Sequence, residues 1–248
     1  MLQINSVNNG NCLDLMSDID DKSIDMILCD LPYGVSACKW DSVIPFEPLW
    51  AHYKRIIKDN GAIVLTASQP FTSALVMSNT KAFRYQWIWD KKIPSGMSYA
   101  RFQPMRQHED VLVFCFGKTP YNPQMVKRDA PIKGGGMSKG ETTANHSLIP
   151  LKKTYDFKNP TTIIQFNKIR KGSVHPTQKP VALFEYLIKT YTNEGELVLD
   201  NCAGSGTTAI ACLKTNRNYI LIEQETKYCD IANKRIAEFL LITNQRID

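Results

Sequence analysis

The sequence lacks the usual features of a secreted, zinc-binding or membrane-spanning protein. It has seven scattered cysteines, no C-x-x-C pair and only four histidines, so it predicts neither a zinc site nor a disulfide framework. Its first ten residues, MLQINSVNNG, lack the basic start and apolar run of a signal peptide. No stretch approaches the roughly 18 apolar residues of a membrane span. These absences predict a protein of the reducing cytoplasm, with no metal and no membrane partner.

The composition is ordinary, but the charge is unevenly distributed. Of the 248 residues, 43% are hydrophobic and 22% charged, which excludes collagen-like and disordered classes and allows one large domain. The net charge is only +6, yet residues 118–172 hold 11 Lys or Arg and 3 Asp or Glu, a net of +8. A compact basic segment is typical of a surface for a polyanion. A solvated loop accounts for it equally well.

Short β-type runs alternate with helical patterns along the chain, which predicts an α/β fold with a mostly parallel sheet. Two further β-type runs, at 85–91 and 109–117, predict an antiparallel pair, and residues 118–172 predict an inserted loop-rich subdomain. The expected parallel strands are 24–29, 62–67, 196–199 and 219–222, and the expected helices are 45–59, one opened by Gln69-Pro70, 180–192, 207–214 and one from Thr226.

A glycine-containing turn, DNCAGSGTT at residues 200–208, lies between a predicted strand and a predicted helix. Glycines there let the backbone turn sharply and approach a ligand. Glu223 ends the next strand, where a carboxylate can accept both hydroxyls of a ribose. These features predict a nucleoside site. Gly204-x-Gly206-x-x-Ala209 also fits the dinucleotide fingerprint, so an NAD-dependent oxidoreductase is an alternative, although only 39 residues follow Ala209.

A second group, Asp30-Leu31-Pro32-Tyr33, directly follows the predicted strand 24–29. Ligands bind at the carboxyl ends of strands in open α/β sheets. The Asp30 carboxylate and the Leu31 carbonyl could accept the two N–H groups of an exocyclic amine, while Tyr33 stacks on its ring. An ordinary turn also uses these residue types.

Together these residues resemble a known family, the β class of amino-group DNA methyltransferases. Asp30-Leu31-Pro32-Tyr33 resembles its catalytic D-P-P-Y motif, and residues 200–208 resemble its D-P-F-A-G-S-G-T-T cofactor motif. Residues 175–180, HPTQKP, match the element that precedes the cofactor strand, and residues 106–109 look like its R-x-H-E element. The resemblance implies a Rossmann-like methyltransferase sheet with a catalytic half at 1–117, a basic target-recognition insert at 118–172 and a cofactor-binding half at 173–248.

The resemblance also implies S-adenosylmethionine as the cofactor and assigns site residues. Lys179 is expected to pair with the methionine carboxylate, and Asn11 to lie near the adenine edge, although a surface turn explains Asn11 equally well. Leu31 replaces the first proline, and Asn201-Cys202 replace Pro-Phe, departures that bear on cofactor affinity rather than reaction type. The implied catalytic residues are Asp30, Leu31, Pro32 and Tyr33; the implied cofactor-binding residues are Asn11, Asp30, Thr177, Gln178, Lys179, Asp200, Cys202, Ala203, Gly204, Ser205, Gly206, Thr207 and Glu223.

The implied reaction is methyl transfer to the N6 amine of adenine in DNA, by base flipping and in-line displacement. N4-cytosine methylation is the alternative, because both amines need the same chemistry; family members acting on cytosine usually have Ser where this chain has Asp30. The implied partners are double-stranded DNA, a second copy of the chain and a cognate restriction endonuclease, in a bacterial cell or a phage-infected host. The expected DNA-binding residues are Lys127, Arg128, Lys152, Lys153, Lys168, Arg170 and Lys171.

Overall fold

A mixed β-sheet forms the centre of the larger of two units in the computed structural model. This main unit comprises Met1–Asn122 and Thr162–Asp248, and the small unit comprises Pro123–Thr161. The structure describes residues 2–35, 38, 41–133, 154–169, 172, 174–175 and 177–245.

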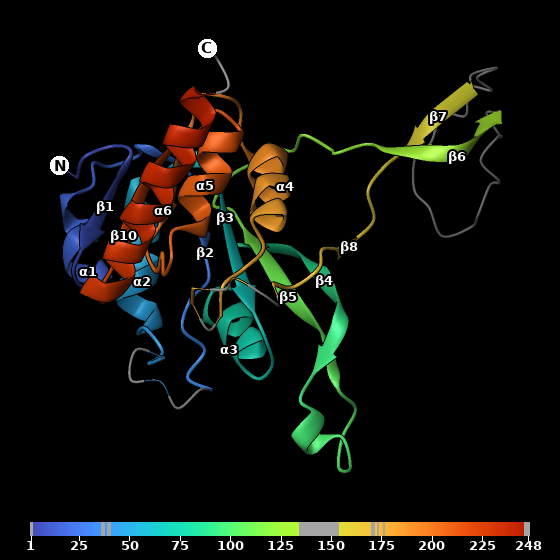
Figure 1. Ribbon diagram of the computed structural model, residues 1–248, viewed down its shortest axis with the longest axis horizontal. Helices are drawn as coiled ribbons and strands as arrows, with labels where there is room; N and C mark the ends of the chain where they lie inside the picture. The colour runs from blue at the N-terminus through green and yellow to red at the C-terminus, as the bar shows by residue number, and fades with distance from the viewer. Residues whose placement is uncertain are drawn as a thin grey trace. The chain divides into compact units, whose positions relative to one another are not determined.

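The described sheet of the main unit has eight strands in the order β1-β10-β9-β2-β3-β5-β4-β8 (Figure 1). The first five are parallel neighbours, whereas β5 runs antiparallel to both β3 and β4. This confirms the predicted α/β fold with an antiparallel pair. The strands are β1 Ser6–Asn9, β2 Ile24–Cys29, β3 Ile57–Ala67, β4 Phe83–Ser95, β5 Arg106–Phe114, β8 Ile163–Gln165, β9 Leu197–Asp200 and β10 Asn218–Glu223.

Helices cover both faces of this sheet. Successive residues of β2 alternate between two cores: Met26 and Leu28 pack with α4 and α5, and Ile27 and Cys29 pack with α2 and α3. A strand buried on both faces is continuously apolar, as the sequence IDMILC is. Among the described helices, none is long and apolar enough to cross a membrane. The helices are α1 Cys12–Leu15, α2 Phe46–Ile56, α3 Phe71–Ser78, α4 Val181–Tyr191, α5 Thr207–Lys214 and α6 Thr226–Asn244, with short 3-10 turns η1 Met16–Asp18 and η2 Met97–Tyr99.

The helix expected at 45–59 is shorter than its sequence pattern predicts. It ends at Ile56, and β3 begins at Ile57, whose backbone is extended and which pairs with Ile24 of β2. Gly61, two residues beyond the expected end of this helix, lies within β3, where a Cβ would come within 2.5 Å of the Ile57 side chain. Strand pairing and burial of Ile57 therefore override the amphipathic pattern, which continues to Asp59.

Two strands of the sheet are absent from the sequence prediction. β1 pairs in parallel with β10, so the N-terminal segment extends the sheet beside the cofactor half. β8 lies within the predicted insert 118–172 but pairs with β4 in the main unit. The small unit, Pro123–Thr161, thus covers a shorter stretch of the chain than that insert. Its described strands are an antiparallel pair, β6 Val126–Lys133 and β7 Thr154–Lys158.

Candidate active site

Polar side chains mark the ends of four neighbouring strands at one edge of the sheet. Glu223 and Asp200 end β10 and β9, Asp30 follows β2, and Thr66 lies one residue before the end of β3. Because these strands are adjacent and parallel, their carboxyl ends meet at the same edge. β5 is antiparallel to β3, so its beginning, with Glu109, joins them. A cavity of about 550 Å³ opens at this edge.

The cavity brings together nearly all of the predicted catalytic and cofactor-binding residues. Gly206 is the exception: it does not line the cavity but caps the start of α5, with φ of +76°. A Cβ there would come within 2.9 Å of the Ala232 Cβ in α6, so this glycine allows the turn and the close helix contact. The predicted residues that line the cavity are Asn11, Asp30, Leu31, Pro32, Tyr33, Thr177, Gln178, Lys179, Asp200, Cys202, Ala203, Gly204, Ser205, Thr207 and Glu223.

Three donors surround the carboxylate of Asp30. The Tyr33 hydroxyl donates to Oδ1 at 2.8 Å, and the Thr66 hydroxyl donates to the same oxygen. Lys179 Nζ donates to Oδ2 at 2.7 Å. A carboxylate has about four lone-pair sites, so about one site remains for a ligand. Burial, followed by the charge of Asp30, raises the pKa of Tyr33 well above its usual value, so the phenol keeps its proton.

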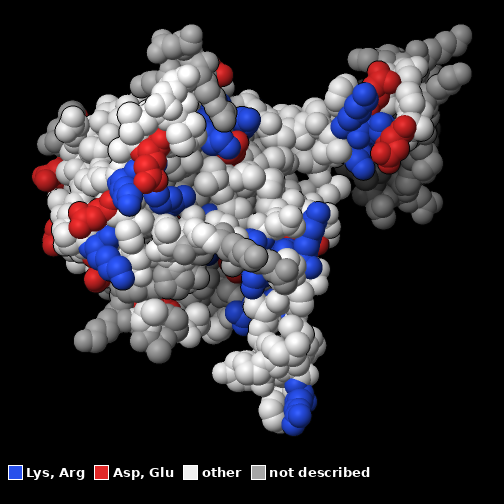
Figure 2. All heavy atoms as spheres, in the orientation of Figure 1, with Lys and Arg blue, Asp and Glu red and all other residues white. Residues whose placement is uncertain are grey.

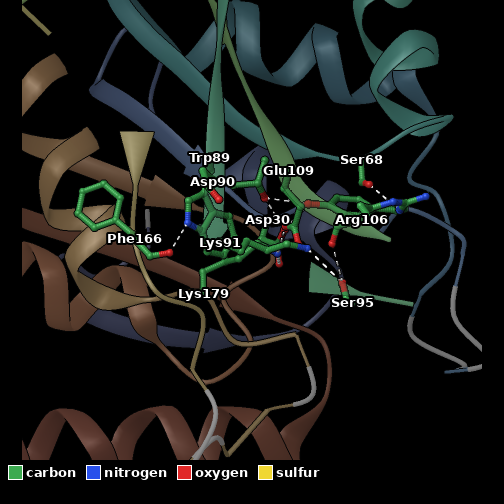
Figure 3. A network of polar contacts seen from close by, with 12 residues as sticks. Asp30, Ser68, Trp89, Asp90, Lys91, Ser95, Arg106, Glu109, Phe166 and Lys179 are labelled. Carbon is green, nitrogen blue, oxygen red and sulfur yellow. Dashed lines mark hydrogen bonds and ion pairs between the residues drawn. The ribbon is translucent and has the colours of Figure 1, made fainter. Parts of the chain in front are cut away.

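Lys179 belongs to a wider charge network (Figure 3). Its Nζ lies 3.4 Å from Glu109 Oε2, and Lys91 Nζ lies 3.1 Å from Glu109 Oε1. Burial lowers the pKa of Lys179, but the carboxylates of Asp30 and Glu109 outweigh it and raise that pKa, so the ammonium keeps its charge. The network therefore pairs two cations with two anions. The protein's own partners of Lys179 are thus Asp30 and Glu109, and the expected pairing with the methionine carboxylate stays a prediction.

The turn that contains the glycines is fixed by buried polar contacts. Asp200 accepts from the backbone N–H of Cys202 at 3.1 Å and from the hydroxyl of Thr208. Burial nevertheless raises the pKa of Asp200 to about 7. Asn201 stands where the D-P-F-A-G-S-G-T-T cofactor motif has its proline. It accepts a hydrogen bond from the buried Tyr53 hydroxyl of α2 at 2.6 Å. This contact explains how the departure is accommodated, because Asn201 ties the turn to α2.

Glu223 lies opposite the same turn. Its Oε2 accepts from the backbone N–H of Gly204 at 2.8 Å, and its Oε1 from that of Glu225 at 2.9 Å. Each oxygen retains a second lone pair, so both could also accept a hydroxyl of a diol such as a ribose. Burial raises the pKa of Glu223, although these two backbone hydrogen bonds act to lower it.

The chain matches the DNA methylase family over residues 24–234. This chain belongs to that family.

Similar proteins span almost the whole of the methylase. The type II methyltransferase M1.MboII of Moraxella bovis is 28% identical, covering 94% of this chain and 96% of the relative. The M1.HpyAVI–SAM complex has a TM-score of 0.62 at 24% identity, covering 93% of this chain and 98% of that one. The PvuII DNA methyltransferase (cytosine-N4-specific) has a TM-score of 0.66 at 14% identity, covering 94% and 90%. The two structures support the methyltransferase fold.

Three further residues predicted to bind the cofactor are held by local hydrogen bonds. The Asn11 side chain caps α1 by accepting from the Leu13 N–H at 2.8 Å. Asn11 therefore both caps a turn at the start of α1 and lines the cavity. Gln178 Oε1 accepts from the Val174 N–H at 3.0 Å. Ser205 Oγ accepts from Arg235 at 2.8 Å. These contacts pre-position the cavity wall before any ligand binds.

Only some of the predicted DNA-binding residues can be placed. Lys127 and Arg128 lie on β6 of the small unit, where Lys127 is exposed and Arg128 Nε donates to the Phe157 carbonyl at 3.2 Å. Lys168 lines the cavity in the main unit. Lys152, Lys153, Arg170 and Lys171 lie outside the described residues. DNA binding by this set stays a prediction.

Sequence reasoning missed three polar residues of the site. Thr66, Lys91 and Glu109 come from β3, β4 and β5, and each reaches the Asp30–Lys179 pair directly or through one neighbour. Glu109 carried a signal, because it ends the R-x-H-E element. Thr66 and Lys91 carried none, since their roles depend on which strands lie beside β2.

The raised pKa of Asp200 predicts a specific pH dependence. The folded methylase holds the proton of Asp200 up to about pH 7, whereas an unfolded chain loses it near 3.8. The folded state thus binds more protons in this window, so the Asp200 contribution to stability is complete below about pH 4 and is lost as pH rises to about 7, by at most about 1.4 kcal/mol per pH unit.

The Asp200→Asn variant isolates this contribution, because an amide resembles the neutral carboxyl and does not titrate. Urea unfolding of both proteins from pH 4.5 to 8 should show wild-type stability falling relative to the variant as pH rises. A difference in unfolding free energy that stays constant with pH would contradict the raised pKa.

Proposed function

We propose that the methylase transfers a methyl group from S-adenosylmethionine to the N6 amine of adenine at specific sites in DNA, after the target base has flipped out of the duplex. The observation that carries this proposal is the Asp30-Leu31-Pro32-Tyr33 group, which shares one cavity with the 200–207 turn and Glu223. An amine acceptor site and a nucleoside site thereby open into the same space.

The cavity fits the cofactor. Its volume of about 550 Å³ lies in the range of small-molecule sites, roughly 300–1,000 Å³. Glu223 supplies a carboxylate for the ribose hydroxyls, and the Gly204 backbone lets the turn approach a ligand. When bound, S-adenosylmethionine supplies a methyl group activated by a positively charged sulfur. The protein therefore needs to orient the acceptor amine and exclude water.

Asp30 and Leu31 are the groups that orient the amine. The nitrogen lone pair of an exocyclic amine is delocalised into the base ring, and accepting both N–H groups favours a pyramidal nitrogen with a localised lone pair. The remaining lone-pair site of Asp30 accepts one N–H, and the Leu31 carbonyl accepts the other. As the nitrogen gains the methyl group it would release one proton to solvent, and the cofactor would leave as an uncharged thioether.

Asp30 also favours adenine over cytosine as the target. In the resembling family, members that act on cytosine usually have Ser at this position. The fold itself does not discriminate, because the PvuII DNA methyltransferase (cytosine-N4-specific) shares it. Flipping the target out of the duplex costs a few kcal/mol, which contacts to the DNA backbone offset.

Type II methyltransferases among the relatives support a restriction–modification context. A homodimer and a cognate endonuclease remain predictions from the sequence resemblance.

Product analysis tests the proposed function. The methylase is incubated with labelled S-adenosylmethionine and unmethylated bacterial genomic DNA, and the digested nucleosides are identified by mass spectrometry. N6-methyl-2′-deoxyadenosine is the expected product. Detection of N4-methyl-2′-deoxycytidine would identify cytosine rather than adenine as the target. The absence of label from every nucleoside would overturn both activities.

A further inference from the structure

The antiparallel hairpin formed by β4 and β5 ends in an exposed group of apolar side chains. Its tip, residues 96–105, contains Met97, Tyr99 and Phe102, of which 75%, 61% and 86% are exposed. Figure 1 shows this hairpin extending away from the rest of the sheet. A cluster of exposed apolar side chains is typical of an interaction surface.

The tip is an ordered structure. The backbone N–H groups of Tyr99 and Phe102 donate to the carbonyls of Gly96 and Tyr99, at 3.0 and 2.9 Å, and form consecutive turns. Gly96 has φ of +92°, which a glycine adopts readily, and a Cβ there would meet no atom within 4 Å. The glycine therefore serves backbone conformation rather than packing, and the turns hold the aromatic side chains outward.

The charge around the tip identifies the kind of partner. Residues 91–108 contain Lys91, Lys92, Arg101 and Arg106 and no acidic residue. Lys91 is buried in the charge network, but Lys92 and Arg101 are exposed. On the face in Figure 2, the end of the hairpin carries basic atoms and no acidic ones. Aromatic rings interleaved with basic side chains fit a nucleic acid, in which bases stack and phosphates carry the charge.

The base of the hairpin is joined to the active site. Ser95, which lines the cavity, donates to the Arg106 carbonyl at 3.2 Å, and Arg106 donates to Ser68 at 2.7 Å (Figure 3). Phe102 is seven residues beyond Ser95, so even an extended chain would place it within about 25 Å. One turn of duplex DNA spans roughly 34 Å. A base in the cavity and the hairpin tip would thus lie within one turn.

We propose that the hairpin tip contacts the DNA duplex beside the target base, with Tyr99 and Phe102 inserted against the bases next to the flipped nucleotide. Lys92 and Arg101 hold the neighbouring phosphates. The apolar rings replace part of the stacking lost when the base leaves the helix. The inference rests on the proposed function in one respect, because it takes DNA as the substrate.

A double variant, Tyr99→Ala with Phe102→Ala, tests the insertion. Transfer is measured on fragmented unmethylated genomic DNA, as duplex and as heat-denatured single strands. kcat/KM on the duplex should fall at least about tenfold, since stacking contributes about 1–3 kcal/mol per base. On single strands, whose bases are already unpaired, the fall should stay within about threefold.

Leu241→Ala with Ile242→Ala is the matched control, because these apolar side chains of α6 are 63% and 54% exposed. It should leave both rates unchanged. An equal loss on both substrates, or no loss on the duplex, overturns the insertion. So does a loss that accompanies a change in apparent mass on gel filtration, which would assign the tip to a contact between two copies.

A binding measurement keeps the test independent of catalysis. For Lys92→Gln with Arg101→Gln, the negative slope of log affinity for duplex DNA against log salt should become less steep by about 2, one phosphate contact for each residue. Lys234→Gln, whose side chain is 78% exposed on α6, should leave the slope unchanged. An unchanged slope in the double variant overturns the phosphate contacts. A wild type that binds DNA but transfers no methyl group would overturn the proposed function and not the hairpin surface.

Discussion

Replacing Asp30 by alanine is expected to abolish methyl transfer to DNA while S-adenosylmethionine still binds. The carboxylate is the acceptor proposed for the target amine, and removing one oriented polar group from a reacting centre typically costs at least about 100-fold in kcat. The cofactor contacts proposed for Glu223 and the 200–207 turn do not depend on this side chain. Transfer is measured with labelled cofactor, and cofactor binding by calorimetry on the same preparation.

Asp25, on the strand that Asp30 follows, provides a matched control. It lies at the opposite end of β2 and is 13% exposed, against 20% for Asp30, and it accepts from Lys58 at 2.6 Å. Asp25→Ala should keep transfer within about threefold. Asp30→Asn, which preserves size, guards against a packing defect in the alanine variant. Loss of cofactor binding together with transfer in both Asp30 variants would assign Asp30 to the cofactor site instead.

Most elements of the main unit could be predicted from sequence because their patterns are local. β2 has the predicted bounds, α5 begins and ends at the predicted residues, and α6 begins at the predicted Thr226. A continuously apolar run and a glycine turn followed by a helix both depend on neighbours within a few residues. β1 was missed because its sequence, SVNN, has no alternation, and its strand conformation comes from pairing with β10.

Some residues of the candidate site could likewise be predicted from local sequence, and others could not. Asp30 and Asp200 lie in motifs that are continuous in sequence, so their positions at the cavity could be inferred. The contact of Lys179 with Glu109 could not, because it depends on β5 lying antiparallel beside β3, which carries Glu109 to the carboxyl edge of the parallel strands. Motif resemblance assigned Lys179 to a cofactor carboxylate, which stays a prediction; in the structure, Lys179 contacts the carboxylates of Asp30 and Glu109.

Replacing Lys179 by methionine should destabilise the protein more than removing any exposed lysine. The Lys179 side chain is 8% exposed and separates the charges of Asp30 and Glu109. Removing one partner of a buried ion pair leaves an uncompensated charge and typically costs about 3–5 kcal/mol. For a chain of this size, the melting temperature should fall by roughly 6–20 °C. Transfer should fall as well, because Asp30 loses one of the three donors that orient it.

Two further variants separate this effect from a general loss of packing. Lys22→Met removes the Lys22–Asp59 pair, 2.8 Å long but with side chains 47% and 85% exposed, and should cost no more than about 1 kcal/mol. Adding Asp30→Asn to Lys179→Met neutralises the nearest uncompensated carboxylate, so the double variant should melt higher than Lys179→Met but lose the transfer activity that Lys179→Met retains. Stability and activity would then change in opposite directions, which a packing defect does not produce. If Lys179→Met has the same melting temperature as the wild type, water rather than Lys179 compensates the charges of Asp30 and Glu109.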